Sequence, residues 1–318
     1  MTAMRTAKIP LLCVALALAA ALAGPPTQAG EITLPPQAAQ ALSQIYSGNP
    51  DAGIAIARSI EQSDPQNPLG YAIEAEALWW KIYCASCEIQ WGMVDAWKGG
   101  KGADAESYLK LAEKIVQLAN AQPGRKDSAE MHLYAGMGWA LQARLYGLRY
   151  DRRKTARAGV RARSEFLRAL QLDPDLADAD VGLGLYNYYV DTLSPLVKLL
   201  RIFMGIPGGS KADGIRQLET GMDHGVLLPV VARFYLAKNL RTYDHRYDQA
   251  LAVAAPLVSN YPRNPVFLLL VGNLNAELGR NAEADTYFRA ALDSAGADPT
   301  CAARASKIAN AFLSISRQ

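Results

Sequence analysis

The chain has 318 residues, of which 50% are hydrophobic and 20% are charged, and its formal net charge is +3. This composition excludes a disordered chain, which would combine low hydrophobicity with a high net charge. The length allows a sizeable core, and the nearly balanced charge does not indicate a nucleic-acid partner.

The first 29 residues have the order of a secretory signal peptide. Arg5 and Lys8 precede an apolar run over residues 9–23, which is shorter than the ~20 residues that a helix needs to cross a bilayer. Small residues favour cleavage after Ala23 or after Ala29. We therefore expect an exported protein, periplasmic or secreted, with one domain over residues 30–318. An uncleaved membrane anchor is the alternative.

From Pro36 onward the chain consists of Ala- and Leu-rich segments with apolar spacings of three and four, separated by Asn-Pro, Asp-Pro or Gly-rich breaks. This pattern predicts an all-α fold, and no alternating run indicates a strand. The predicted helices cover residues 36–46, 50–63, 68–97, 103–120, 128–149, 154–171, 177–190, 193–204, 211–223, 229–241, 246–259, 265–278, 282–295 and 299–315.

Cys84 and Cys87 lie three positions apart in the predicted helix 68–97, so they should share one face. In an exported chain they are a possible disulfide or two packed thiols, and Cys301 could pair with either. A redox motif would need a preceding strand, a zinc finger would need a second ligand pair, and haem attachment would need His in place of Glu88. We expect no metal and no cofactor.

Four arginines, Arg149, Arg153, Arg157 and Arg161, recur every four residues, and a continuous helix would place them in one stripe. The stripe is either a solvated face or a patch for an anionic partner such as a lipid headgroup, an acidic peptide or an envelope polymer. The further candidate partner-binding residues are Tyr186, Asn187 and Tyr188.

Small and aromatic residues recur with a period of 34 positions: Ala250 and Ala254 are followed at this distance by Ala284 and Phe288. Small residues at such positions let two helices cross closely, while larger neighbours fill the groove of the next helix pair. The predicted repeat-packing residues are Ala162, Phe166, Ala169, Pro174, Gly184, Ala250, Ala254, Gly272, Ala284, Phe288 and Ala291.

With this spacing the chain resembles the tetratricopeptide repeat (TPR) superfamily over residues 36–315. The resemblance implies a right-handed α-solenoid of stacked antiparallel helix pairs, with a concave inner face that binds a protein or peptide.

The apolar stretch 193–204 interrupts the repeat rhythm and predicts an inserted helix that is apolar nearly all round. We expect a core helix on the concave side, or alternatively an interfacial element or a partner-binding surface. The segment resembles the tetratricopeptide repeat protein 39 group, which includes mitochondrial outer-membrane inclusion-clearance proteins, through Gly184, Asn187, Leu193, Pro195, Leu199, Leu200, Gly205, Gly208 or Gly209, Gly214 and Leu218.

The three histidines, His132, His224 and His245, are isolated and belong to no catalytic or zinc motif, so we expect no enzyme. The sequence predicts an exported TPR-type scaffold or adaptor that binds a peptide or protein partner in a concave groove, with no nucleic acid and possibly at a membrane surface. The alternative is an envelope- or lipid-associated protein that uses the apolar helix 193–204 and the basic stripe 149–163.

Overall fold

The computed structural model describes residues 33–124, 126, 128–195, 198, 201–202, 205–294 and 298–315. These residues belong to one compact unit, Glu31–Gln318. The predicted leader, residues 1–29, lies outside the described residues, and so do six of the twelve residues of the predicted helix 193–204.

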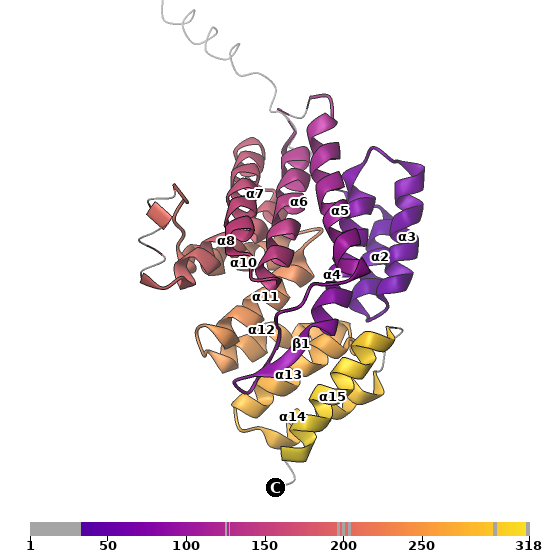
Figure 1. Ribbon diagram of the computed structural model, residues 1–318, viewed down its shortest axis with the longest axis vertical. Coiled ribbons are helices and arrows are strands. Elements are labelled where there is room, and N and C mark those ends of the chain that lie inside the picture. The colour runs from indigo at the N-terminus through magenta and orange to yellow at the C-terminus, as the bar shows by residue number, and fades with distance from the viewer. Residues whose placement is uncertain are drawn as a thin grey trace, which may run out of the picture. The chain divides into compact units, whose positions relative to one another are not determined.

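The described residues form thirteen helices and one two-stranded antiparallel sheet (Figure 1). The first half contains α2 (Pro36–Tyr46), α3 (Pro50–Ser63), α4 (Pro68–Ala85), β1 (Cys87–Gln90), β2 (Met93–Ala96), α5 (Ala103–Ala121), α6 (Ala129–Leu148) and α7 (Arg152–Leu172). The second half contains α8 (Ala177–Thr192), α10 (Lys211–His224), α11 (Pro229–Thr242), α12 (Tyr247–Asn260), α13 (Pro265–Glu277), α14 (Asn281–Asp293) and α15 (Pro299–Ile315).

The Asn-Pro breaks act as helix starts. The side chain of Asn67 accepts a hydrogen bond from the Leu69 N–H at the start of α4, and Asn264 accepts from Val266 at the start of α13. Proline follows each of these asparagines in the first helical turn, where its missing N–H costs nothing. The same two-residue signal therefore ends one helix pair and begins the next.

Consecutive helices pack in pairs, and the predicted repeat-packing residues lie where the two helices of a pair cross. Each of the predicted Ala and Phe residues is buried. A Cβ atom at Gly272 would lie 2.9 Å from the Phe288 ring, and one at Gly184 would lie 2.9 Å from the carbonyl oxygen of Gly214. Glycine is thus required at both crossings because the neighbouring group occupies the place of a side chain. Pro174 is exposed in the turn after α7.

The sheet corrects the expectation of a purely helical chain. The predicted helix 68–97 ends at Ala85, and residues 87–96 instead form a hairpin in which Cys87 lies opposite Ala96. The two turn residues are Trp91, with φ +50°, and Gly92, with φ +80°. A two-residue turn with both φ values positive matches the twist of a hairpin. The sequence signal was weak because tryptophan is not a usual residue in such a turn.

Helices far apart in the sequence meet at α4, which packs against α2, α5 and α6 and also against α15. The ring centre of Trp80 lies 4.9 Å from that of Phe234 on α11 and 5.2 Å from that of Phe267 on α13. Two cavities beside this cluster have volumes of about 10 Å³ and 20 Å³, enough for a water molecule at most. We call the buried helices α4, α11 and α13 the inner layer.

The inner layer covers one face of α4. Aromatic side chains of α11 and α13 pack against Trp80 on this face. Binding of a peptide in a concave groove stays a prediction.

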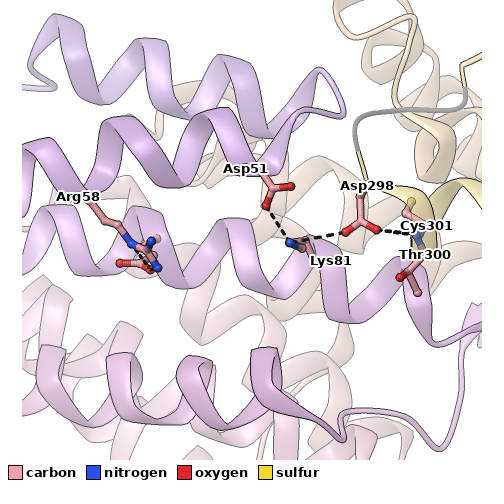
Figure 2. A network of polar contacts seen from close by, with 7 residues as sticks. Asp51, Arg58, Lys81, Asp298, Thr300 and Cys301 are labelled. Carbon is pink, nitrogen blue, oxygen red and sulfur yellow. Dashed lines mark hydrogen bonds and ion pairs between the residues drawn. The ribbon is translucent and has the colours of Figure 1, made fainter.

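Polar contacts and a disulfide hold the start of α15 against α3 and α4. Figure 2 shows Lys81 between two carboxylates: its Nζ atom lies 2.7 Å from Oδ1 of Asp51 and 3.8 Å from Oδ2 of Asp298. Asp298 also accepts hydrogen bonds from the backbone N–H groups of Thr300 and Cys301, which fixes the first turn of α15. Cys301 is bonded to Cys84 of α4 across 217 positions of sequence. The last helix is thus tied covalently to an early one.

Candidate functional site

Aromatic side chains, three of them exposed and two partly buried, lie on the hairpin and at neighbouring helix ends. We call Trp91, Trp97, Tyr150, Tyr189 and Tyr243 the aromatic surface. Trp91 is 78% exposed, and Tyr150 and Tyr243 are each 44% exposed, which is unusual for such large apolar groups. The ring centres of Trp91 and Trp97 are 5.5 Å apart, those of Trp97 and Tyr150 are 5.2 Å apart, and those of Tyr189 and Tyr243 are 6.0 Å apart.

Asp95 of β2 affects the pKa of one tyrosine in each half of the aromatic surface. Burial raises the pKa values of Tyr150 and Tyr189, and the negative charge of Asp95 contributes to both increases. Tyr243 also contributes to the increase at Tyr150. The charge of Asp95 thus acts on a tyrosine in each half of the aromatic surface.

Asp95 attaches the hairpin to the inner layer. Its Oδ1 atom accepts a hydrogen bond of 2.8 Å from the hydroxyl of Tyr83, and its Oδ2 atom lies 3.0 Å from Nζ of Lys238 on α11. Burial alone would raise the pKa of Asp95, but the charges of Lys238 and Arg241 hold it below its usual value. Burial alone would lower the pKa of Lys238, and Asp95 raises it instead. Both groups are therefore charged at neutral pH.

Asn273 of α13 provides a second attachment. Its side-chain oxygen accepts from the Val94 N–H at 3.2 Å, and its side-chain amide donates to the Gly92 carbonyl at 2.9 Å. Arg241 donates to the same Asn273 oxygen at 3.0 Å. The turn that carries Trp91 is thereby held on both sides, so the aromatic surface is fixed before any ligand arrives.

Sequence reasoning missed Lys238, although the repeat spacing contained a signal. Lys238 lies 34 positions before Gly272 and twelve before Ala250, the place that glycine occupies in the neighbouring repeat. A lysine at a helix crossing must bury its stem and needs a carboxylate within reach. The partner, Asp95, could not be identified because the hairpin was predicted as helix.

The predicted stripe of four arginines is not continuous. Helix α6 ends at Leu148, Tyr150 has φ +60°, and the Asp151 side chain caps α7 by accepting from the Lys154 N–H. Arg149 therefore lies before the helix that carries the other three. It donates to the Gly100 carbonyl and to Glu106, linking the end of α6 to the start of α5.

Arg153, Arg157 and Arg161 remain exposed on α7. The guanidinium carbon of Arg161 lies 4.5 Å from the centre of the Trp139 ring, a cation–π contact that holds this side chain against α6. These three arginines are exposed to solvent, and a patch for an anionic partner remains a prediction.

The other predicted partner-binding residues lie on α8 and point to different surroundings. Tyr186 is half-buried and donates from its hydroxyl to the Pro207 carbonyl. Asn187 donates to Gln217 of α10. Tyr188 is fully buried and donates to the Asn239 carbonyl and to Asp244. Tyr186 thus contacts Arg163 of α7, whereas Tyr188 is buried in the interior of the protein.

The cysteines are arranged differently from the expected local pair. Cys84 is bonded to Cys301, and Cys87 is a buried free thiol. The prediction of a Cys84–Cys87 disulfide assumed one continuous helix, but Cys87 lies in β1, where the three-residue spacing no longer places the two side chains on one face. Burial and Asp95 raise the pKa of Cys87 well above its usual value, so this thiol is not a nucleophile at neutral pH.

Within the described ranges, no group of three or more His, Cys, Asp or Glu side chains is placed to hold a metal ion. None of the helices described there is both long enough and apolar enough to cross a membrane. His132 contacts Glu165 at 2.7 Å, and His245 contacts Tyr247 at 3.0 Å. The expectations of no cofactor and no catalysis remain predictions.

No protein-family model and no curated protein matches the chain. Similar solved structures include the C-terminal part of a TPR repeat-containing protein from Cytophaga hutchinsonii, 13% identical with a TM-score of 0.35, covering 86% of this chain and 95% of that chain. The TPR domain of P58(IPK) is 12% identical with a TM-score of 0.26, covering 89% and 98%. The human IFIT1 dimer with PPP-AAAA is 15% identical with a TM-score of 0.31, covering 90% and 69%.

These neighbours are TPR proteins by name in two cases, but TM-scores this low carry no argument about fold or ligand. The helical architecture described above rests on this chain's own packing. The resemblance of the central segment to the tetratricopeptide repeat protein 39 group remains a prediction.

Proposed function

We propose that the chain is an exported helical-repeat scaffold that binds an extended peptide or protein segment through the aromatic surface. The observation that carries the proposal is the exposure of Trp91, Tyr150 and Tyr243, of which Trp91 lies in the turn of a hairpin that Asp95 and Asn273 fix to the inner layer. Tryptophan and tyrosine are the residues that most often dominate binding energy at protein interfaces.

A fixed aromatic surface suits a peptide because little conformational entropy is lost on the side of the scaffold. The rings offer apolar faces for side chains of the partner, and tyrosine hydroxyls offer hydrogen bonds to its backbone. Lys98, whose Nζ atom lies 5.9 Å from the centre of the Trp97 ring, adds a positive charge at the rim. We therefore expect segments with apolar side chains and an acidic residue.

Binding is proposed rather than catalysis because Asp95 and Asp244, two carboxylates next to this surface, are already paired. Asp95 is held by Tyr83 and Lys238, and Asp244 is held by Tyr188 and Lys211. A general acid or base needs a free position within hydrogen-bond reach of a substrate. Asp95 and Asp244 thus form their hydrogen bonds and ion pairs with other groups of the folded chain.

Export is part of the same proposal. The order of residues 1–29 supports it, and so does the Cys84–Cys301 disulfide, since such bonds persist in oxidising compartments. Mass spectrometry of the protein recovered from the cell envelope or medium should find a chain that begins at Gly24 or Gly30. Recovery of the uncleaved chain would contradict it.

The aromatic surface can be tested with a random peptide library displayed on phage and selected against the immobilised full chain. We expect enriched peptides to bind in solution and to lose at least about tenfold in affinity, or ~1.4 kcal/mol, with Trp91→Ala and with Tyr243→Ala. Val226→Ala is the matched control, because Val226 is an exposed apolar residue away from this surface, 36% exposed in the α10–α11 connection.

Binding that survives Trp91→Ala and Tyr243→Ala but is lost with Val226→Ala would refute the proposed surface. Circular dichroism of each variant separates loss of binding from loss of folding, and Trp91→Ala should leave the helical signal unchanged.

A further inference from the structure

Two arginines meet at the ring of Tyr186, next to the α8–α10 connection. The Cζ atom of Arg163 on α7 lies 5.6 Å from the centre of this ring. Arg201 lies within the connection, and a Cβ atom at Gly208 would come within 2.8 Å of its Nη1 atom. Burial raises the pKa of Tyr186, and the charges of Arg163 and Arg201 both oppose that rise. The Tyr186 hydroxyl donates to the carbonyl of Pro207, the residue before Gly208, so Arg201 also lies beside Tyr186.

Within the described residues, neither guanidinium group is neutralised. Nε of Arg163 and both Nε and Nη1 of Arg201 are buried and have no hydrogen-bond partner there. Three carboxylates on the same elements pair with other groups: Glu165 with His132, Asp191 with Lys198, and Asp213 with Arg216. Residues 193–210 contain no Asp or Glu.

This arrangement is costly without a counter-charge. Two like charges at short distance repel each other more strongly in a protein than in water, and buried N–H donors without acceptors lose hydrogen bonds that water would supply. An anion between the two groups would remove both costs.

We propose that Arg163 and Arg201 form a binding site for a phosphate group. A guanidinium group presents a planar fork of N–H donors that matches phosphate oxygens, and two such groups balance a phosphate dianion. The Tyr186 ring positions Arg163 through a cation–π contact, and Gly208 leaves the space in which Arg201 lies. The site shares no residue with the aromatic surface, so the phosphate proposal does not depend on the proposed peptide binding.

Calorimetric titration of the full chain with inorganic phosphate, in low-salt buffer near neutral pH, tests the site. We expect binding that weakens at least about tenfold with Arg163→Gln and with Arg201→Gln. Arg153→Gln, an exposed arginine on α7, is the matched control and should change affinity less than twofold. Gly208→Ala should also weaken binding, because it displaces Arg201 without removing its charge.

Thermal unfolding in phosphate-free buffer separates a binding role from a structural one. Removing one of two unpaired like charges should leave the unfolding temperature of Arg201→Gln equal to or above that of the parent chain. Added phosphate should then raise the unfolding temperature of the parent chain but not of the variant. The proposal is overturned if the parent chain binds no phosphate at ~10 mM, if both arginine variants bind as the parent does, or if phosphate-free Arg201→Gln unfolds at a lower temperature.

The phosphate could belong to a free molecule or to a lipid headgroup. Ile202, next to Arg201, is 67% exposed and offers an apolar contact for an acyl chain. Glycerol phosphate and a short-chain phosphatidylglycerol, kept below its micelle concentration, distinguish the sources. Equal affinities identify a free phosphate ligand, whereas tighter lipid binding that Ile202→Ser removes identifies a headgroup, and either result supports the site.

Discussion

Helices α4 and α7 have similar lengths but opposite environments. Fifteen of the eighteen residues of α4 are buried, against four of the twenty-one residues of α7. Helix α4 is covered on one side by its neighbours in sequence and on the other by α15 and the aromatic rings of α11 and α13. Stability is thus concentrated in the inner layer, which leaves the outer helices and the hairpin free to carry exposed aromatic and basic groups.

Trp80 on α4 and Trp91 in the hairpin turn test this contrast most directly. Trp80 is 4% exposed and its indole N–H donates to Glu76, whereas Trp91 is 78% exposed. Trp80→Ala should lower the free energy of unfolding by about 3–5 kcal/mol, because it leaves a cavity between three helices. Trp91→Ala should lower it by less than about 1 kcal/mol. Denaturant unfolding followed by circular dichroism measures both.

Equal losses for the two variants would mean that α4 is not the core of the chain. If only Trp91→Ala lowered the free energy of unfolding, stability would depend on the hairpin rather than on α4. The hairpin would then be a structural element rather than a binding surface.

Lys238 and Asp95 connect the two regions, so their removal should have the next largest effect. Lys238→Met leaves the buried Asp95 carboxylate without its ion-pair partner and should cost about 2–4 kcal/mol. Asp95→Asn in the same chain should recover part of this loss, because it removes the uncompensated charge. A double-mutant cycle on unfolding free energies gives the coupling, and additive losses would show that the pair does not hold the hairpin.

The repeat could be predicted from the sequence because its signal is local. Ala250 and Phe288 mark helix crossings through spacing alone, and the Asn-Pro breaks mark helix starts through capping. The approach of α15 to α4 could not be predicted in the same way. The position of α15 depends on how successive helix pairs curve over the whole chain. The sequence around Cys301 also did not indicate that Cys84, rather than Cys87, is its disulfide partner.

The candidate site was the part that sequence reasoning found least well. Trp91 and Trp97 fall within the predicted helix 68–97, because the apolar sequence before them is typical of a helix. The hairpin forms through distant groups, Asn273 and Lys238, which supply its hydrogen bonds and its ion pair. Tertiary contacts therefore override the local helix preference there.

The interface between the outer helix α3 and α4 should respond to pH. Glu61 of α3 lies beside Glu74 and Arg58, and a Cβ atom at Gly70 of α4 would come within 2.7 Å of its Cγ atom. Burial raises the pKa of Glu61 to about 8, the hydrogen bond and charge of Glu74 add to the increase, and Arg58 opposes it. Folded chains therefore keep this carboxyl protonated at neutral pH.

Unfolded chains release that proton near pH 4.5, the ordinary value for glutamate. Between about pH 4.5 and 8 the folded state holds one more proton than the unfolded state, so the free energy of unfolding should fall as pH rises through this range. The partial exposure of Glu61 limits the loss to the order of 1–2 kcal/mol. Glu61→Gln resembles the protonated carboxyl and should flatten the profile between pH 5 and 8. A variant that keeps the slope of the parent chain would show that the pH response arises at other groups than the α3–α4 interface.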